Sequence, residues 1–465
     1  MFLSVATLLV AAVPAEGTPL DRAIEALVPG TVIVGEEPAP SSIHEAMAEL
    51  RVPAVSIALI DDNRIVAARS FGWADPAQRV PAHLDTRFQA ASLSKSVAAM
   101  TMMALVEAGA LDLDLPVNAR LSRWRLPEGE HAPATLRSLL SHRAGTSVSG
   151  FPGYADPAAT PDLVAVLEGR GNTDPVELVS APGTFSYSGG GYSVAQLLVE
   201  EVEGQPFADV AARVLLVPLG MDRSSFAQPP RAAREKLALA HDEQGRLIAG
   251  GYHLYPEQAA AGLWTTPRDL ALFLIAANRA HAGETGLPVG PAGMRTLLTA
   301  PGGDSDYALG FGTSGSGADF RIGHSGSNMG YKAYMFSFPE RGEGLVIMTN
   351  GELGAPLFQS IAAAVAREMD WPGFEQRRLV RAPATPEALA RIAGVYLLDE
   401  RAFAFSVDGD RLSLRNPQGE IEPSILIEGD RLYFPQGGQI VDVERGPGGE
   451  VTALVAGDTR LPRAD

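Results

Sequence analysis

The stretch Ala90-Ala91-Ser92-Leu93-Ser94-Lys95 opens an apolar run that extends from Val97 to Val106. The run lacks glycine and proline and consists mostly of strong helix formers, so it predicts a helix from about Ser92 to Ala108. Because this helix is apolar on nearly every side, we expect it in the middle of a large core. Ser92 and Lys95 are three residues apart and fall on one face of its first turn.

The pairing of a serine with a lysine has a chemical use. A serine hydroxyl is a poor nucleophile unless a neighbouring base takes its proton. A lysine amine serves as that base only where burial and the positive end of a helix dipole disfavour the ammonium. Of the 37 basic residues three are lysine and 34 are arginine, and one of the three lysines stands here, where arginine could not be deprotonated. The pair therefore suggests Ser92 as a nucleophile and Lys95 as its proton-transfer partner; the alternative is chance, since a serine three residues before one of three lysines arises roughly one time in five.

The composition is that of a soluble globular protein, with 46% hydrophobic and 20% charged residues. A length of 465 residues predicts one large domain and a smaller one. The formal net charge of −18 argues against nucleic acid and anionic membranes as partners. The sequence has no cysteine and no H-E-x-x-H motif, so we predict no metal and no other cofactor.

The N-terminus carries a short apolar run, Phe2 to Val13, which ends in the cleavage-like pattern Val13-Pro14-Ala15. No basic residue precedes the run, which is atypical of a signal peptide; the alternatives are a mis-chosen start codon and an N-terminal core segment. The run is too short to span a bilayer, and no other segment is long and apolar enough. We predict a signal peptide over residues 1–15 and an exported protein, periplasmic or extracellular, that is not an integral membrane protein.

Strand patterns stand at both ends of the first 370 residues, with helical patterns between them. Residues 135–300 are expected to be mostly helical, interrupted by loops rich in glycine and proline. A sheet completed by joining the two ends predicts an α+β fold rather than an alternating α/β fold. The expected elements are helices over Ser41–Leu50 and Pro356–Glu368, and strands over Ala54–Ile60, Arg64–Phe71, Phe320–Ile322, Tyr331–Phe338 and Leu345–Thr349.

The pattern changes beyond a basic, proline-containing stretch that we expect to be a linker over residues 376–387. Short β segments then follow one another, separated by Asp-Gly, Glu-Gly and Gly-Gly turns, and they predict a small antiparallel sheet or barrel over residues 388–465. We expect six strands there: Ala404–Val407, Arg411–Leu414, Ser424–Ile427, Arg431–Phe434, Ile440–Val443 and Val451–Val455.

Two further motifs carry polar groups of chemical interest. Tyr187 lies in a Ser/Gly-rich loop before an amphipathic helix, where it could pass a proton near a Ser–Lys pair or simply pack its ring in a turn. Gly323-His324-Ser325-Gly326-Ser327 precedes an expected strand, where its glycines would let a substrate pair with the strand edge. The alternative for this second motif is a turn with a solvated histidine. His142, next to another turn, is expected to form structural hydrogen bonds rather than to act as a base.

Together these motifs resemble the serine β-lactamase and penicillin-binding-protein superfamily, in its class C-like branch. The resemblance runs from about Val52 to Arg367. It rests on Ser92-Leu93-Ser94-Lys95, Tyr187-Ser188-Gly189 and His324-Ser325-Gly326, in that order, with secondary matches at Leu139-Leu140-Ser141-His142, Pro218-Leu219-Gly220-Met221 and Gly262 through Asp269. The resemblance implies an antiparallel sheet flanked by helices, a helical subdomain, and a catalytic domain over residues 16–375. The tail resembles the lipocalin-like domain that some peptidase-like members carry.

The resemblance also implies roles for individual residues. Ser92 would be acylated, with Lys95 and Tyr187 as its proton-transfer partners in an order that the sequence leaves open. The backbone N–H groups of Ser92 and Ser327 would form the oxyanion hole. The substrate would contact Ser188, Gly189, His324, Ser325 and Gly326.

Two departures from the family pattern bear on the substrate. His324 stands where a lysine often provides a fixed positive charge, and Gly189 stands where an asparagine amide usually binds the substrate's acylamide. Both changes predict a hydrolase of small esters or D-amino-acid-type amide bonds rather than an efficient β-lactamase. The alternatives are a β-lactamase or acyltransferase of the same fold, and a slowly turning-over sensor of peptidoglycan fragments or penicillin. The sequence makes no prediction of the oligomeric state.

Overall fold

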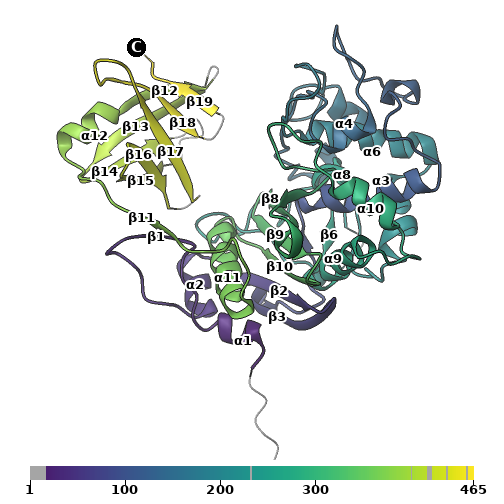
Figure 1. Ribbon diagram of the computed structural model, residues 1–465, viewed down its shortest axis with the longest axis horizontal. Helices are drawn as coiled ribbons and strands as arrows, with labels where there is room; N and C mark the ends of the chain where they lie inside the picture. The colour runs from purple at the N-terminus through teal and green to yellow at the C-terminus, as the bar shows by residue number, and fades with distance from the viewer. Residues whose placement is uncertain are drawn as a thin grey trace, which may run out of the picture.

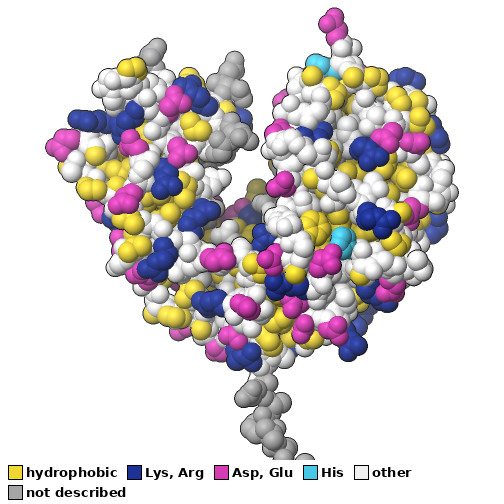
Figure 2. Space-filling model, in the orientation of Figure 1, with side chains coloured by type: hydrophobic (Ala, Val, Ile, Leu, Met, Phe, Trp, Pro, Cys, Tyr) yellow, Lys and Arg dark blue, Asp and Glu magenta, His cyan; other side chains and the backbone are white. Residues whose placement is uncertain are grey.

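The computed structural model describes residues 17–230, 233–398, 401–415, 421–435, 438–456 and 459–464; the predicted signal peptide lies outside these ranges. The chain folds into a large lobe of helices and sheet and a smaller all-β lobe (Figure 1). Figure 2 shows a groove between the two lobes. The predicted α+β fold class, with a small all-β C-terminal part, is confirmed.

The large lobe is built on a seven-stranded antiparallel sheet in the order β4-β3-β2-β10-β9-β8-β7. Strand β2 pairs with β10, with Ile57 opposite Ile347, so the two ends of the domain are joined as predicted. The strands are β2 (Ala54–Asp61), β3 (Arg64–Asp75), β4 (Val80–Pro81), β7 (Gly312–Ser314), β8 (Arg321–Asn328), β9 (Tyr331–Phe338) and β10 (Glu343–Thr349).

Helices cover both faces of this sheet, which is why β2 is buried along almost its whole length. Its side chains alternate: Ala58 and Ile60 join the core that includes helix α9 (Pro267–His281), whereas Ile57 and Leu59 join the core on the opposite face. That second core is closed by α1 (Pro19–Ala23), α2 (Ile43–Glu49) and α11 (Gly354–Met369).

The part between the sheet ends is less helical than predicted. Two long segments, 168–188 and 217–257, contain little helix in their described residues because proline and glycine recur through them. The helices that do form are α3 (Leu93–Glu107), α4 (Leu136–Leu140), α5 (Leu163–Leu167), α6 (Gly189–Glu203), α7 (Phe207–Ala211), α8 (Gln258–Ala261) and α10 (Pro291–Leu298). The predicted helix after Ser92 is α3, and 12 of its 15 residues are buried.

The small lobe is an eight-stranded antiparallel meander, in which each strand pairs with the next. A bridge between Tyr396 and Arg463 brings its ends together into a nearly closed barrel, and α12 (Pro386–Ile392) packs on its core. The strands are β12 (Gly394–Leu398), β13 (Arg401–Asp408), β14 (Arg411–Arg415), β15 (Ile421–Ile427), β16 (Arg431–Phe434), β17 (Gln439–Arg445), β18 (Val451–Ala456) and β19 (Thr459–Pro462).

The predicted number of six strands was wrong. Strands β12 and β19, the two ends of the meander, were missed because neither alternates apolar and polar residues clearly, and β19 ends in a proline. Pairing with β13 and β18, rather than local propensity, holds these two strands in place.

The segment predicted as a linker is anchored on both sides. Within it, β11 (Arg377–Leu379) pairs in parallel with β1 (Thr31–Ile33), and the N–H of Ala382 donates to the carbonyl of Leu426 in the barrel. Four buried side chains form a small core at this junction: Ile33, Leu379, Ile427 and Tyr433. The boundary between the two domains stays a prediction. In the described part of the chain, no helix has both the length and the apolar character needed to cross a bilayer.

Candidate active site

The first turn of α3 brings Ser92 and Lys95 together. The side-chain nitrogen of Lys95, Nζ, lies 3.1 Å from Ser92 Oγ and donates a second hydrogen bond, of 2.9 Å, to the carbonyl of Ala260 in α8. Ser92 stands at the N-cap of α3, but its hydroxyl makes no capping hydrogen bond. Lys95 is buried, whereas Ser92 is only half-buried. The hydroxyl is therefore within reach of both a buried amine and solvent.

Ser92 follows a sharp turn of the backbone at Ala91. Ala91 has a φ of +50°, a conformation that costs free energy for a residue with a side chain. Gly326 on β8 packs directly against this turn: a Cβ atom at Gly326 would lie 2.4 Å from the carbonyl oxygen of Ala90. The glycines of this motif were predicted to let a substrate approach the strand edge, whereas Gly326 allows the close approach of β8 to the turn that carries Ser92.

The Gly323–Ser327 motif was predicted to precede a strand; it lies within strand β8 itself and is followed, across a turn, by β9. Strand β7 pairs only with Arg321–Gly323, so from His324 onward β8 has one paired edge, toward β9, in the described structure. Ser325 and Ser327 are exposed there. An extended substrate could add to this edge through backbone hydrogen bonds.

Tyr187 lies at the other side of the Ser–Lys pair. Its ring centre is 4.9 Å from Lys95 Nζ and 6.2 Å from the ring of His324. The structure thus brings Ser92, Lys95, Tyr187 and His324 into one site, although they are dispersed over more than 230 residues of sequence.

Ser188 does not present its side chain to a substrate, contrary to the prediction. It is fully buried and caps α6: its hydroxyl accepts from the N–H of Gly191 and donates to the carbonyl of Ser147, at 2.7 Å. Its own N–H donates to Nδ1 of His142, at 3.0 Å. Burial lowers the pKa of His142 well below its ordinary value, so this histidine is a neutral hydrogen-bond acceptor, in agreement with the structural role expected for it.

His324 is held as a neutral imidazole. Burial, and next the positive charge of Lys95, lower the pKa of His324 to about 4. Its Nε2 lies 3.0 Å from the hydroxyl of Tyr307, and its Nδ1 contacts the carbonyl of Ser325. Because a carbonyl only accepts, the proton belongs on Nδ1, and Tyr307 donates to Nε2. The site therefore offers no permanent cation at this position at neutral pH.

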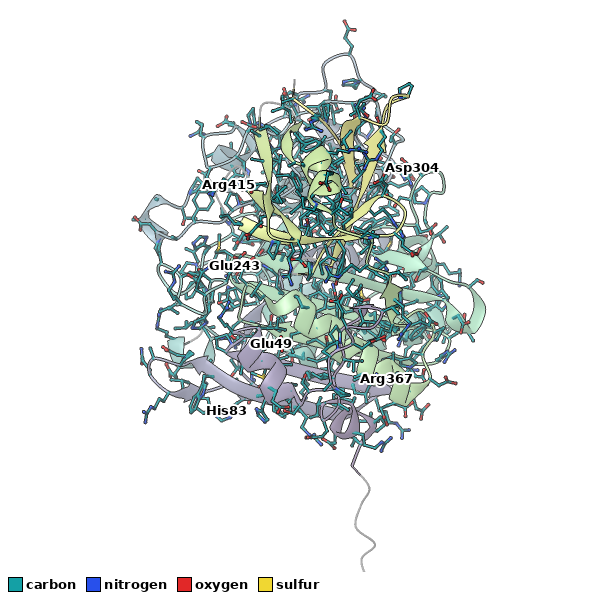
Figure 3. All side chains as sticks on the ribbon, turned by 90° about the vertical axis from the view of Figure 1, so that its left-hand side faces the viewer. Glu49, His83, Glu243, Asp304, Arg367 and Arg415 are labelled. Atoms are coloured by element: carbon teal, nitrogen blue, oxygen red, sulfur yellow. The ribbon has the colours of Figure 1, made fainter. Side chains whose placement is uncertain are left out.

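An ion pair between the buried Arg143 and the exposed Asp304 connects the loops of Tyr187 and Tyr307. The Arg143 guanidinium donates to Asp304 Oδ1 and to the carbonyl of Gly183, each at 2.7 Å, while Asp304 Oδ2 accepts from the N–H of Phe185. Asp304 is labelled in Figure 3. These contacts hold both tyrosines in fixed positions next to His142, whose ring centre is 4.2 Å from that of Tyr187 and 4.8 Å from that of Tyr307.

A family model described as Beta-lactamase matches residues 41–369, which is more than two thirds of the chain. The chain belongs to the beta-lactamase family. This is a family of serine hydrolases in which proteins named esterase, penicillin-binding protein and class C beta-lactamase all occur.

Individual relatives agree with this beta-lactamase family membership. The chain is 30% identical over 201 residues to Esterase EstB of Burkholderia gladioli, a match that covers 41% of this chain and only about half, 51%, of that protein. It is 26% identical to Penicillin-binding protein 4 of Amycolatopsis lactamdurans, over 75% of this chain and 94% of that protein. The fold is similar to the octameric penicillin-binding protein homologue from Pyrococcus abyssi, with a TM-score of 0.62 at 24% identity over 90% of this chain and 98% of that one.

Several residues of this beta-lactamase family site were not predicted from the sequence. Tyr307, Arg143 and Asp304 act through other side chains, and nothing in a single sequence places their segments next to Tyr187. Glu257, immediately before α8, is another: it is fully buried, and neither carboxylate oxygen has a hydrogen-bond partner in the described structure. Its backbone carbonyl accepts from the N–H groups of Ala260 and Ala261, so Glu257 supports the turn whose Ala260 carbonyl binds Lys95.

The buried carboxyl of Glu257 should make stability depend on pH. Burial raises its pKa from 4.5 to about 8. Between these values the group ionises in the unfolded chain but stays protonated in the folded one, so each pH unit favours unfolding by about 1.4 kcal/mol. We expect Glu257→Gln to remove this loss, so that its advantage in unfolding free energy over the unaltered protein grows by about 3 kcal/mol from pH 5.5 to 7.5. Denaturant titrations at the two pH values measure the unfolding free energies, and Glu130→Gln, at an exposed position, is the control. If the difference between Glu257→Gln and the unaltered protein is the same at both pH values, the raised pKa of Glu257 is wrong.

Proposed function

We propose that the protein is a serine hydrolase that cleaves small, uncharged esters through an acyl-enzyme on Ser92. The observation that carries the proposal is the 3.1 Å contact between Lys95 Nζ and Ser92 Oγ, at a turn where the serine is open to solvent and the lysine is not. A nucleophile beside a buried amine is the arrangement that serine hydrolysis without a histidine base requires. We also propose that the protein is exported. Cleavage of D-amino-acid-type amide bonds by the same acyl-enzyme route is the alternative to ester hydrolysis.

In the proposed reaction, Ser92 Oγ attacks the carbonyl carbon of the ester while its proton passes to Lys95 or Tyr187. The backbone N–H groups of Ser92 and Ser327 would stabilise the negative oxygen of the tetrahedral intermediate. The ester C–O bond then breaks, and the leaving oxygen takes up a proton and departs as an alcohol. Water adds to the acyl-serine, the acid is released, and Ser92 recovers its proton.

Intact-mass spectrometry tests this proposal. After incubation with p-nitrophenyl butyrate and rapid acid quench, a mass increase of one butyryl group should map to the peptide that contains Ser92. The same experiment with benzylpenicillin distinguishes the alternatives. Rapid, complete turnover of penicillin would favour a β-lactamase, and a stable penicilloyl adduct without ester turnover would favour a sensor.

The neutral state of His324 supports an uncharged substrate over a β-lactam, whose carboxylate needs a cation. We expect His324→Lys to raise kcat/KM for benzylpenicillin acylation at least about tenfold relative to that for p-nitrophenyl butyrate, since a hydrogen bond to a charged group contributes about 1.5–3 kcal/mol. His324→Gln, which is uncharged, is the matched control. An equal change for both substrates in His324→Lys would show that position 324 does not select against the carboxylate.

A further inference from the structure

The first turn of α6 is in direct contact with the loop Thr146–Phe151. The N–H of Gly189 donates to the carbonyl of Ser149, at 3.1 Å, and the N–H of Gly190 donates to that of Val148, at 2.9 Å. A Cβ atom at Gly190 would lie 2.7 Å from the carbonyl oxygen of Ser147. The run of glycines at the start of α6 therefore allows backbone-to-backbone contact and fixes this loop on the helix.

This contact places the ring of Phe151 against Gly189. A Cβ atom at Gly189 would lie only 2.8 Å from Cε2 of Phe151, so the ring occupies the space that a side chain at position 189 would take. Gly189 is two residues from Tyr187, and in the family that the chain resembles an asparagine amide usually occupies its place. Phe151 is half-buried on the large core, so part of its ring stays open.

The same loop is connected to the edge of β8 through Tyr255. The Tyr255 hydroxyl donates to the carbonyl of Pro152, at 3.4 Å, and accepts from the N–H of Met329, at 3.2 Å, just beyond the end of β8. Tyr255 itself is buried, and burial raises its pKa, which keeps the hydroxyl protonated as a donor. The loop that carries Phe151 is therefore connected on one side to the segment that follows Tyr187 and, through Tyr255, to the end of β8.

We propose that Phe151 forms an apolar acyl subsite, so that the enzyme prefers esters of unsubstituted aliphatic or aryl acids and rejects acylamino substrates. This rests on the proposed acylation of Ser92. An aliphatic acyl chain loses water-exposed apolar surface on the ring and gains free energy. An acylamino group in the same place would bring its amide against the ring without a hydrogen-bond partner there, which costs free energy.

Two esters of equal chain length separate these cases: the p-nitrophenyl esters of pentanoic acid and of N-acetylglycine, with the uncatalysed rate subtracted. We expect the unaltered protein to favour the pentanoyl ester at least about tenfold in kcat/KM. Phe151→Ala should lower this ratio about tenfold, and Phe151→Leu should largely retain it. Adding Gly189→Asn to Phe151→Ala should lower the ratio further, because an amide then replaces the ring. Phe403→Ala, half-buried in the barrel, is the matched control.

The outcomes separate this inference from the proposed function. A ratio near one in the unaltered protein, which needs no variant, would overturn the apolar subsite, and so would a ratio that Phe151→Ala leaves unchanged. If both esters are still hydrolysed at the unaltered rate by Ser92→Ala, the acyl-serine mechanism itself is wrong. Hydrolysis that requires Ser92 but ignores Phe151 contradicts the subsite alone.

Discussion

Replacing Ser92 by alanine should abolish ester hydrolysis, with kcat falling on the order of 10⁴-fold or more. The change removes the oxygen that forms the acyl bond in the proposed mechanism. The fold should persist, because the Ser92 hydroxyl makes no helix cap and is not needed to hold the turn. Initial rates with p-nitrophenyl butyrate measure the effect, and a thermal melt verifies the fold.

Ser94→Ala is the matched control for this variant. Ser94 lies in the same turn, but its hydroxyl accepts from the N–H of Leu263, at 3.0 Å, inside the core. We expect this control to lose about 1 kcal/mol of stability while keeping most of its turnover. If Ser92→Ala hydrolyses the ester at a rate close to that of the unaltered protein, the nucleophile is another group.

Lys95→Arg should be nearly as damaging as Lys95→Ala, with a loss of about 10³-fold or more in kcat/KM, even though it conserves the charge. An arginine side chain stays protonated and cannot accept the serine proton. The site also has no room for the longer, planar group: Lys95 Nζ is enclosed by Ser92, the Ala260 carbonyl, and the rings of Tyr187 and Tyr192 at 4.9 and 5.7 Å.

The pH-rate profile adds a second readout for Lys95, because a variant that only disturbs packing would lower the rate without changing the profile. Lys95→Arg should change the shape of the profile as well as lower the rate. Recovery of a tenth of the rate or more in Lys95→Arg would contradict a proton-accepting role. The stability of the same variants, followed by thermal melting, separates loss of chemistry from loss of fold.

The core of the site could be predicted because its residues lie in short local patterns. The helix after Ser92 follows from composition alone, and so do the two strands of the hairpin that starts at Ala54. The Gly323–Ser327 motif was predicted to precede a strand, with a turn as the alternative; it lies within β8, where pairing with β9 outweighs the low strand propensity of glycine. Ser188 was assigned to the substrate because the family motif contains it, whereas its hydroxyl is taken up by the cap of α6.

Other features depend on contacts between distant segments and have no local signature. Arg143 and Asp304 are 161 residues apart, and Tyr307 reaches His324 only because β7 and β8 turn its loop toward the site. In the sequence, nothing distinguishes Phe151 from other loop phenylalanines; its contact with Gly189 is visible only in the structure. For the same reason the outer barrel strands, which are fixed by their neighbours, were missed.

The pairing of β2 with β10 also sets the order in which this molecule can be assembled. Asp61 ends β2 and Glu343 begins β10, so the central pair of the sheet cannot form until about 280 further residues have been synthesised. At about 5–20 residues per second, this takes roughly 14–56 s after β2 is made. Helix α3 is synthesised early in that interval, roughly 220 residues before Gly326 on β8, the strand that packs against the Ser92 turn. Closure of such distant contacts makes folding slow, and a growing chain brings the residues of the candidate site together only when the last strands of the sheet are in place.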